Sequence, residues 1–217
     1  SPSMNKDVQV VVVTPDAALG KKAVACPVIY LLHGYGGNAK TWIGVKPDLP
    51  QIADEKGIIF VCPDGKNSWY WDSPKDPSYR YETFVSSELV KYIDGHYKTI
   101  ADRKGRAITG LSMGGHGAMW NAIRHKDTFG AGGSTSGGVD IRPFPLNWDM
   151  SKQLGEFAYN KKVWDEHTVI NQIDKIENGD LAIIIDCGEA DFFLNVNKDL
   201  HCLLYTSPSP RDRQKSR

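Results

Sequence analysis

A five-residue motif, Gly110-Leu111-Ser112-Met113-Gly114, constrains the fold of this 217-residue chain more than any other feature. Residues 105–109, which precede it, have the length and apolar character of a short buried strand, and residues 114–125 continue towards a helix. Glycines on both sides of Ser112 permit a sharp turn between the two elements. The motif therefore predicts a strand-turn-helix unit that presents the serine hydroxyl as a nucleophile.

A second glycine-rich segment, His33-Gly34-Tyr35-Gly36-Gly37, follows an apolar run that predicts another buried strand. Acyl transfer needs two backbone N–H groups directed at the oxygen that becomes negative in the tetrahedral intermediate. A loop of this composition can supply one of them, because glycine permits close approach. We predict the Tyr35 amide as this donor, with Gly36 as the alternative, and the Met113 amide as the other. Gly34 and Gly36 are then predicted to border the substrate.

Short apolar runs alternate with helical patterns along the chain, and this alternation favours a mostly parallel sheet with helices on both faces. Ligands of such sheets bind at the carboxyl ends of the strands, where both glycine-rich segments are expected to lie. The candidate strands are residues 8–13, 28–32, 58–62, 106–109 and 181–186, and residues 134–138 are expected to follow a further strand and line the pocket floor.

Four segments resemble, in order and spacing, an esterase family of α/β-hydrolases: residues 32–38, 69–70, 110–118 and 186–191. That family includes tributyrin esterases, S-formylglutathione hydrolases, feruloyl and acetylxylan esterases and the antigen 85 mycolyltransferases. The resemblance runs from about Val8 to His201 and implies an α/β-hydrolase with a Ser-Asp-His triad. It also implies that Asp191 is the triad acid. From the residues alone, Asp186 and Glu189 remain alternatives for the triad acid. Asp186 is better suited to holding the backbone amides of the loop, and Glu189 to facing solvent.

No histidine is well placed as the triad base. His33 is predicted to hold the oxyanion loop, and His116 to pack on the helix after the motif. His96 and His125 are predicted to lie near helix ends, and His167 precedes the acid in chain order. His201 follows Asp191 after only ten residues. The resemblance implies a strand between acid and base, and this spacing leaves no room for it.

Residues from Cys202 onward resemble the in-frame translation of a sequencing-library adaptor. We therefore predict an α/β-hydrolase domain over residues 1–201 that lacks its last strand and helix, and a non-native, disordered tail over residues 202–217. The alternative is a natural disordered tail rich in Ser, Pro and Arg. Because the resemblance places the catalytic histidine in the absent part, we expect this chain to be nearly inactive.

Composition favours a single globular domain, and the resemblance implies a small-molecule or polysaccharide-linked ester as substrate. The formal net charge is zero, but the tail holds four basic residues and one acidic residue, which leaves 22 basic and 25 acidic residues elsewhere. That balance argues against a nucleic-acid partner, and no membrane span or signal peptide is visible. Cys26, Cys62 and Cys187 lack the paired spacing of a zinc site, so neither metal nor cofactor is predicted. Cytoplasmic and exported locations both remain open.

Two long loops, residues 64–81 and 139–164, carry aromatic residues that suit a substrate cleft. We predict that Trp69, Tyr70 and Trp148 contact substrate, while the alternative is that they anchor the loops to the core. The predicted activity is hydrolysis of short-chain, acetyl or feruloyl esters through an acyl-serine. An acyltransferase that uses a sugar hydroxyl in place of water and a non-catalytic carbohydrate-binding relative are the alternatives.

Overall fold

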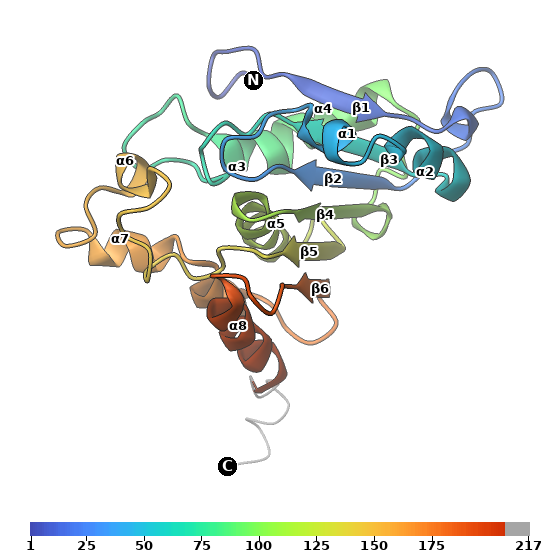
Figure 1. The fold of residues 1–217 in the computed structure, drawn as a ribbon. Helices are drawn as coiled ribbons and strands as arrows, with labels where there is room; N and C mark the ends of the chain where they lie inside the picture. Colours follow the sequence, from blue (N-terminus) through green and yellow to red (C-terminus); the bar gives the residue numbers. More distant parts are fainter. Residues whose placement is uncertain (207–217) are drawn as a thin grey trace.

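The computed structural model describes residues 1–206, in which a six-stranded sheet is flanked by helices (Figure 1). The strand order is β1-β3-β2-β4-β5-β6, and only β1 runs antiparallel to its neighbour. The strands are β1 (Val10–Val13), β2 (Val28–Leu32), β3 (Ile59–Pro63), β4 (Arg106–Gly110), β5 (Ala131–Thr135) and β6 (Ala182–Asp186). The carboxyl ends of the five parallel strands therefore meet at one edge of the sheet.

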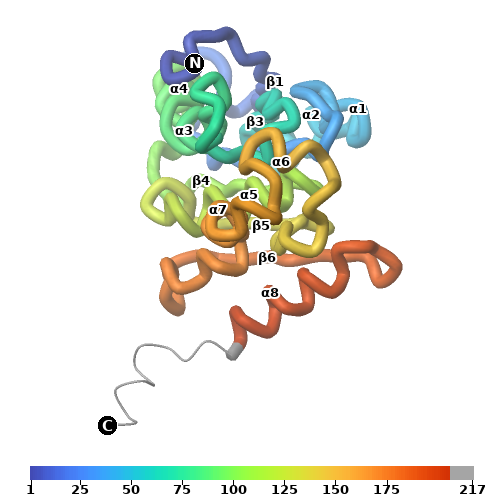
Figure 2. The backbone as a smooth tube through the Cα atoms, turned by 90° about the vertical axis from the view of Figure 1, so that its left-hand side faces the viewer, coloured from blue at the N-terminus to red at the C-terminus, as the bar shows by residue number. Residues whose placement is uncertain are grey.

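The helices cover the sheet from both faces (Figures 1 and 2). They are α1 (Thr41–Val45), α2 (Leu49–Lys56), α3 (Tyr81–Thr83), α4 (Leu89–His96), α5 (Met113–Arg124), α6 (Met150–Leu154), α7 (Lys161–Glu166) and α8 (Leu194–Thr206). A π-helical segment, Phe84–Glu88, joins α3 to α4, and 3₁₀ segments lie at Asp16–Ala18, Arg103–Gly105 and Val169–Lys175.

Two apolar layers hold the sheet between these helices. On one face, Leu49 and Ala53 of α2 pack against Phe60 and Cys62 of β3. On the other face, α4 and α5 contribute to a larger core that includes Ile108 and the inward residues of β2. Alternation along the strands separates the two layers, since successive side chains point to opposite faces. The predicted arrangement of helices on both faces of a mostly parallel sheet is confirmed.

The strand predicted at residues 181–186 is present as β6, but the expectation that it is buried is wrong. β6 is the edge of the sheet in the described part of the chain, and its residues alternate between exposed and half-buried, with Ile184 75% exposed. Next to β6, the exposed Ile184 side borders an apolar groove that is also lined by Ile29, Ala107 and Ala131. An apolar run alone cannot distinguish an edge strand from a central one, because the same residues suit both. The further strand expected ahead of residues 134–138 is present as β5, which extends to Thr135 although its Ala-Gly-Gly-Ser-Thr composition lacks a strand signal.

Part of the segment predicted as a disordered tail is ordered. Residues 202–206 continue α8 without interruption, and Leu204 packs against the main core. An amphipathic helix propagates through such residues because each further turn adds a backbone hydrogen bond and an apolar contact. The prediction of disorder from Cys202 is therefore wrong for this turn of helix. The remaining predicted tail, 207–217, lies outside the described residues.

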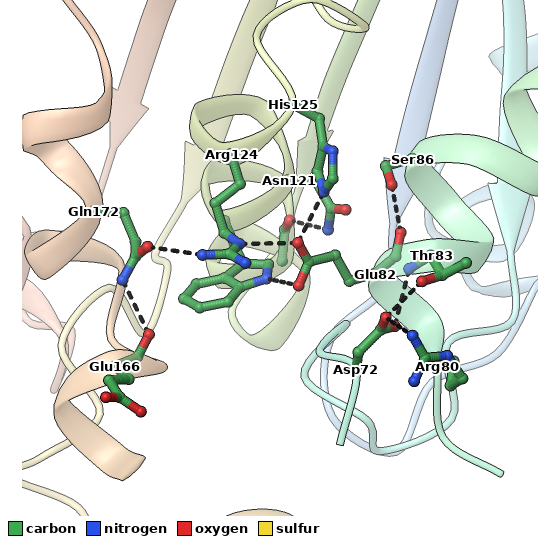
Figure 3. A network of polar contacts seen from close by, with 12 residues as sticks. Asp72, Arg80, Glu82, Thr83, Ser86, Asn121, Arg124, His125, Glu166 and Gln172 are labelled. Carbon is green, nitrogen blue, oxygen red and sulfur yellow. Dashed lines mark hydrogen bonds and ion pairs between the residues drawn. The ribbon is translucent and has the colours of Figure 1, made fainter. Parts of the chain in front are cut away.

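A buried ionic network joins α3 to the end of α5 (Figure 3). The Glu82 carboxylate accepts hydrogen bonds from Trp120 Nε1, Arg124 Nε and His125 Nε2, each at 2.8 Å. Burial alone would raise the pKa of Glu82, but the bonds from His125 and Arg124 outweigh it and lower the pKa to about 2. Gln172 extends the network from Arg124 to the Val169–Lys175 segment. The network fixes the helix that carries the Gly110–Gly114 motif.

Within residues 1–206, no helix is both long and apolar enough to cross a bilayer. Cys26 and Cys62 are buried free thiols, and Cys187 is a half-buried one. Burial raises the pKa of Cys62 to about 12, which keeps that thiol protonated and unreactive. Cys26 and Cys62 are thus thiols packed in the core.

Candidate active site

The turn between β4 and α5 holds Ser112 in a strained backbone conformation. Its φ is 58° and its ψ is −114°, a region that side-chain-bearing residues seldom adopt and that costs roughly 1–3 kcal/mol. Two neighbouring segments hold the turn: Ser112 N donates to Thr135 O at 2.9 Å, and Ser112 O accepts from His116 N at 3.0 Å. The side chain is half-buried and its hydroxyl has no hydrogen-bond partner among residues 1–206. The strand-turn-helix arrangement predicted from the motif is present.

Close approach between the turn and β2 explains the motif glycines. A Cβ at Gly114 would overlap the carbonyl oxygen of Leu32 and lie 2.7 Å from that of His33. A Cβ at Gly110 would lie 2.7 Å from the same Leu32 oxygen. Because these are backbone atoms of a central strand, they cannot move aside cheaply. The two glycines thus permit the turn to sit directly on the end of β2.

The loop after β2 is fixed by a buried histidine. His33 Nδ1 donates to Gly34 O at 2.7 Å, and Gly65 N donates to His33 Nε2 at 2.9 Å. Burial lowers the pKa of His33, with smaller opposing effects from the Gly34 bond and Asp64. The ring is therefore neutral, with both nitrogens engaged. The predicted role of His33, holding the loop, is confirmed.

Hydrogen bonding separates the two alternatives for the loop's oxyanion donor. Gly36 N donates to Asn67 Oδ1 at 2.8 Å, whereas the Tyr35 amide has no partner among the described residues. Gly34 brings the loop to the turn, since its Cβ position lies 3.6 Å from Ser112 Cβ. Met113 begins α5, where the first amides have no intrahelical acceptor. Tyr35 and Met113 thus offer unpaired N–H groups beside the serine.

Asp191 lies in the loop between β6 and α8, as predicted. Its Oδ1 accepts from Phe193 N at 2.7 Å, and the side chain is half-buried. Of its alternatives, Glu189 faces solvent and Asp186 ends β6, where the Asp186 carbonyl accepts from Ser136 N at 2.7 Å. That bond and the Ser112–Thr135 bond link the ends of β4, β5 and β6. The other carboxylate oxygen of Asp191, Oδ2, has no hydrogen-bond partner among the described residues and is free to accept one.

No histidine ring hydrogen-bonds Ser112 among residues 1–206. His125 bonds Glu82, and the rings of His96 and His167 bond backbone carbonyls of their own helices. His201 lies beside Tyr205 on α8. His116 is enclosed by the rings of three tryptophans, Trp69, Trp71 and Trp120. That no histidine is well placed as the triad base stays a prediction.

The structure corrects the prediction for two of the aromatic residues. Trp69 and Tyr70 are 1% and 0% exposed, so they support the loop rather than contact substrate. Their positive φ values, 56° and 60°, turn both rings inward. The Tyr70 ring fits against Gly117 of α5 and its hydroxyl donates to His33 O at 3.2 Å. Trp148 is half-buried and stays available to a ligand.

Sequence reasoning missed two amides that position the site. Asn67 holds the Gly36 amide, and Asn197 Nδ2 donates to Gly137 O at 2.8 Å from α8. Gly138 N in turn donates to Ser112 O at 3.4 Å, so the Asn197 bond to Gly137 helps to fix the loop behind the serine. Neither asparagine belongs to a recognisable motif, and only the tertiary fold brings them near Ser112. In the described residues no cluster of His, Cys, Asp or Glu could hold a metal ion.

His116 is expected to make the fold sensitive to acid. Its Nδ1 donates to Gly138 O at 2.9 Å, and complete burial lowers its pKa from 6.5 to about 3. Below pH 6.5 the unfolded chain takes up a proton that the folded chain does not, so stability falls as pH decreases to about 3. We expect His116→Asn, which keeps a donor, to remove about 1.4 kcal/mol per pH unit of this slope in urea unfolding. The exposed His201→Asn should retain the slope, and a slope unchanged in His116→Asn would contradict the assignment.

A mostly parallel sheet that carries a strained serine between β4 and α5, with a glycine loop from β2 against it, defines an α/β-hydrolase. The chain belongs to the esterase family of this fold: the family model described as "Putative esterase" matches residues 1–216.

Curated relatives agree with this assignment. The chain is 27% identical over 194 residues to an esterase of Mycobacterium tuberculosis, a match that covers 79% of this chain and 42% of that protein. It is 25% identical over 185 residues to an acetyl esterase of Caldicellulosiruptor saccharolyticus, covering 79% and 68%. The chain thus spans less than half the length of the mycobacterial relative.

Solved structures share the fold. A ferulic acid esterase superposes with a TM-score of 0.76 at 27% identity, covering 97% of this chain and 84% of that one. An S-formylglutathione hydrolase from Staphylococcus aureus superposes with a TM-score of 0.78 at 20% identity, covering 96% and 85%. At that identity the second comparison concerns the fold alone.

Proposed function

We propose that the chain carries the acyl-transfer machinery of a serine carboxylic-ester hydrolase, with Ser112 as nucleophile. The observation that carries the proposal is the strained Ser112 backbone, held by Thr135 and His116 with the hydroxyl unpaired. Strain of this kind persists only where surrounding structure enforces it, and it is concentrated at functional sites. Membership of the esterase family supports the same reaction class.

In the proposed reaction, Ser112 Oγ attacks the ester carbonyl while a base removes its proton. The amides of Tyr35 and Met113 would stabilise the oxyanion, and the alcohol leaves with a proton as the acyl-serine forms. Water then attacks the acyl-serine and releases the acid. Asp191 would orient the base and stabilise its charged form. We propose that this chain reacts slowly, because none of the six histidines reaches the serine.

The proposed substrates are short-chain or carbohydrate-linked esters, in line with the acetyl esterase and ferulic acid esterase among its relatives. An acyltransferase of the mycolyltransferase type shares the same acyl-serine. Transfer would be recognised by ester products when an alcohol acceptor is added. No observation of the fold favours transfer, so hydrolysis stands as the proposal.

Chemical rescue tests both parts of this proposal. We expect free imidazole to replace the missing base and to raise p-nitrophenyl acetate hydrolysis by this chain at least about tenfold above that of Ser112→Ala in the same buffer. A fluorophosphonate should label Ser112, located by peptide mass spectrometry. Ser87→Ala, which alters a half-buried serine in the Phe84–Glu88 segment, should behave as the parent chain.

Two outcomes would contradict it. Equal rates in the parent chain and Ser112→Ala with imidazole, together with no label on Ser112, would remove the nucleophile assignment. Full activity without imidazole would instead show that a base within the chain reaches the serine.

A further inference from the structure

An exposed aromatic pair stands at the rim of the candidate site. Phe192 is 63% exposed and stacks on Trp148 with ring centroids 5.5 Å apart and an interplanar angle of 25°. The adjacent Phe193 is 1% exposed and packs against both rings. The pair is thus the outer end of a continuous aromatic cluster. It presents a flat apolar surface that the fold does not bury.

The backbone beneath this pair is held in an unfavourable conformation. Trp148 and Asp149 have φ values of 51° and 55°, a left-handed region that costs free energy for residues with side chains. Three bonds enforce it: Trp69 Nε1 donates to Trp148 O at 3.3 Å, Tyr35 OH donates to Asp149 Oδ2 at 2.7 Å, and Lys152 Nζ pairs with Asp149 Oδ1 at 3.0 Å. The Trp148 ring and the Asp149 carboxylate are therefore fixed before any ligand arrives.

The pair is also attached to the elements that carry the proposed chemistry. Phe192 directly follows Asp191, and Asp149 is bonded to the side chain of Tyr35, whose amide is the proposed oxyanion donor. The rings of Trp69 and Phe193 lie against Gly138, whose N–H is 3.4 Å from Ser112 O. These contacts place the pair close to Ser112, within reach of a substrate bound there.

We propose that Trp148, Phe192 and Asp149 form a platform for a sugar ring of the ester substrate. A sugar ring offers an apolar C–H face for stacking and hydroxyl donors at its edge. Asp149 is only partly screened, with 42% of its side chain exposed, so its oxygens can accept from such hydroxyls beyond the bonds to Tyr35 and Lys152. A plain aryl group would use the rings but not the carboxylate. This inference rests on the proposed function and specifies its substrate as a carbohydrate ester.

Binding of xylotriose, which has no ester to cleave, tests the platform without catalysis. We expect a saturable shift of the Trp148 indole N–H signal in ¹H–¹⁵N spectra, with Trp148→Phe identifying the signal. Phe192→Leu should raise the dissociation constant about fivefold or more, and Asp149→Asn should also raise it. The matched control is Tyr92→Leu, which removes a 56% exposed ring stacked on His96 in α4 and should leave binding unchanged.

Several results would overturn the platform. If benzyl alcohol shifts the Trp148 signal and xylotriose leaves it unmoved, the pair is an aryl site. Movement of the signal with protein concentration alone would mark a contact between two copies of the chain. Xylotriose binding should persist in Ser112→Ala, because the platform does not include the serine. If a fluorophosphonate fails to label Ser112 while xylotriose still binds, the hydrolase proposal is rejected and the platform is retained.

Discussion

Gly114→Ala is expected to destabilise the chain by more than about 4 kcal/mol, enough to prevent folding at ambient temperature. The added methyl group would overlap the Leu32 carbonyl and press on that of His33, both in the backbone at the end of β2. Relief requires separating α5 from the sheet, and α5 is buried along nearly its whole length. Urea unfolding followed by circular dichroism would measure the loss.

Gly95→Ala is the matched control for this change. Gly95 lies in α4 with no atom near its Cβ position and without a positive φ, so alanine should stabilise the helix by about 0.5–1 kcal/mol. If alanine lowers the free energy of unfolding at Gly114 and raises it at Gly95, the loss at Gly114 is due to close approach of the backbone and not to helix propensity. A Gly114→Ala chain as stable as the parent would show that the turn does not rest on β2.

Glu82→Gln is expected to cost about 3 kcal/mol, because one carboxylate satisfies three donors at the buried junction of α3 and α5 (Figure 3). An amide presents one oxygen to those donors and turns its own N–H groups towards Arg124 or His125. The comparison is Glu166→Gln, whose 56% exposed side chain pairs loosely with Lys162 and should change stability by less than about 0.5 kcal/mol.

The same substitution should change the response to acid. Because the folded pKa of Glu82 is lowered from 4.5 to about 2, its stabilisation is present above pH 4.5 and is lost as pH falls towards 2. The difference in unfolding free energy between the parent chain and Glu82→Gln should therefore shrink as the pH falls from 4.5 to 2. If the difference between the two chains stays constant from pH 5 to pH 2.5, the carboxylate does not titrate as its contacts imply.

The motif around Ser112 was predictable because its signal is local. Glycines at fixed spacing between an apolar run and a helix permit one tight turn, and the structure has that turn. Local patterns were poorer guides where burial decides the outcome. Trp69 and Tyr70 were predicted to contact substrate, yet they turn inward onto Gly117 and Gly138, positions whose lack of side chains mattered only after folding.

The sequence by itself determined the class of fold, the strand-turn-helix unit that carries Ser112 and the glycine-rich loop that faces it, since each depends on local patterns of residues. Tertiary structure alone decided that Asn67 occupies the Gly36 amide and leaves that of Tyr35 unpaired, and that Glu82 joins α3 to α5. It also decided which face of β6 is exposed. These outcomes depend on hydrogen bonds and packing between segments far apart in the chain, which no local pattern encodes.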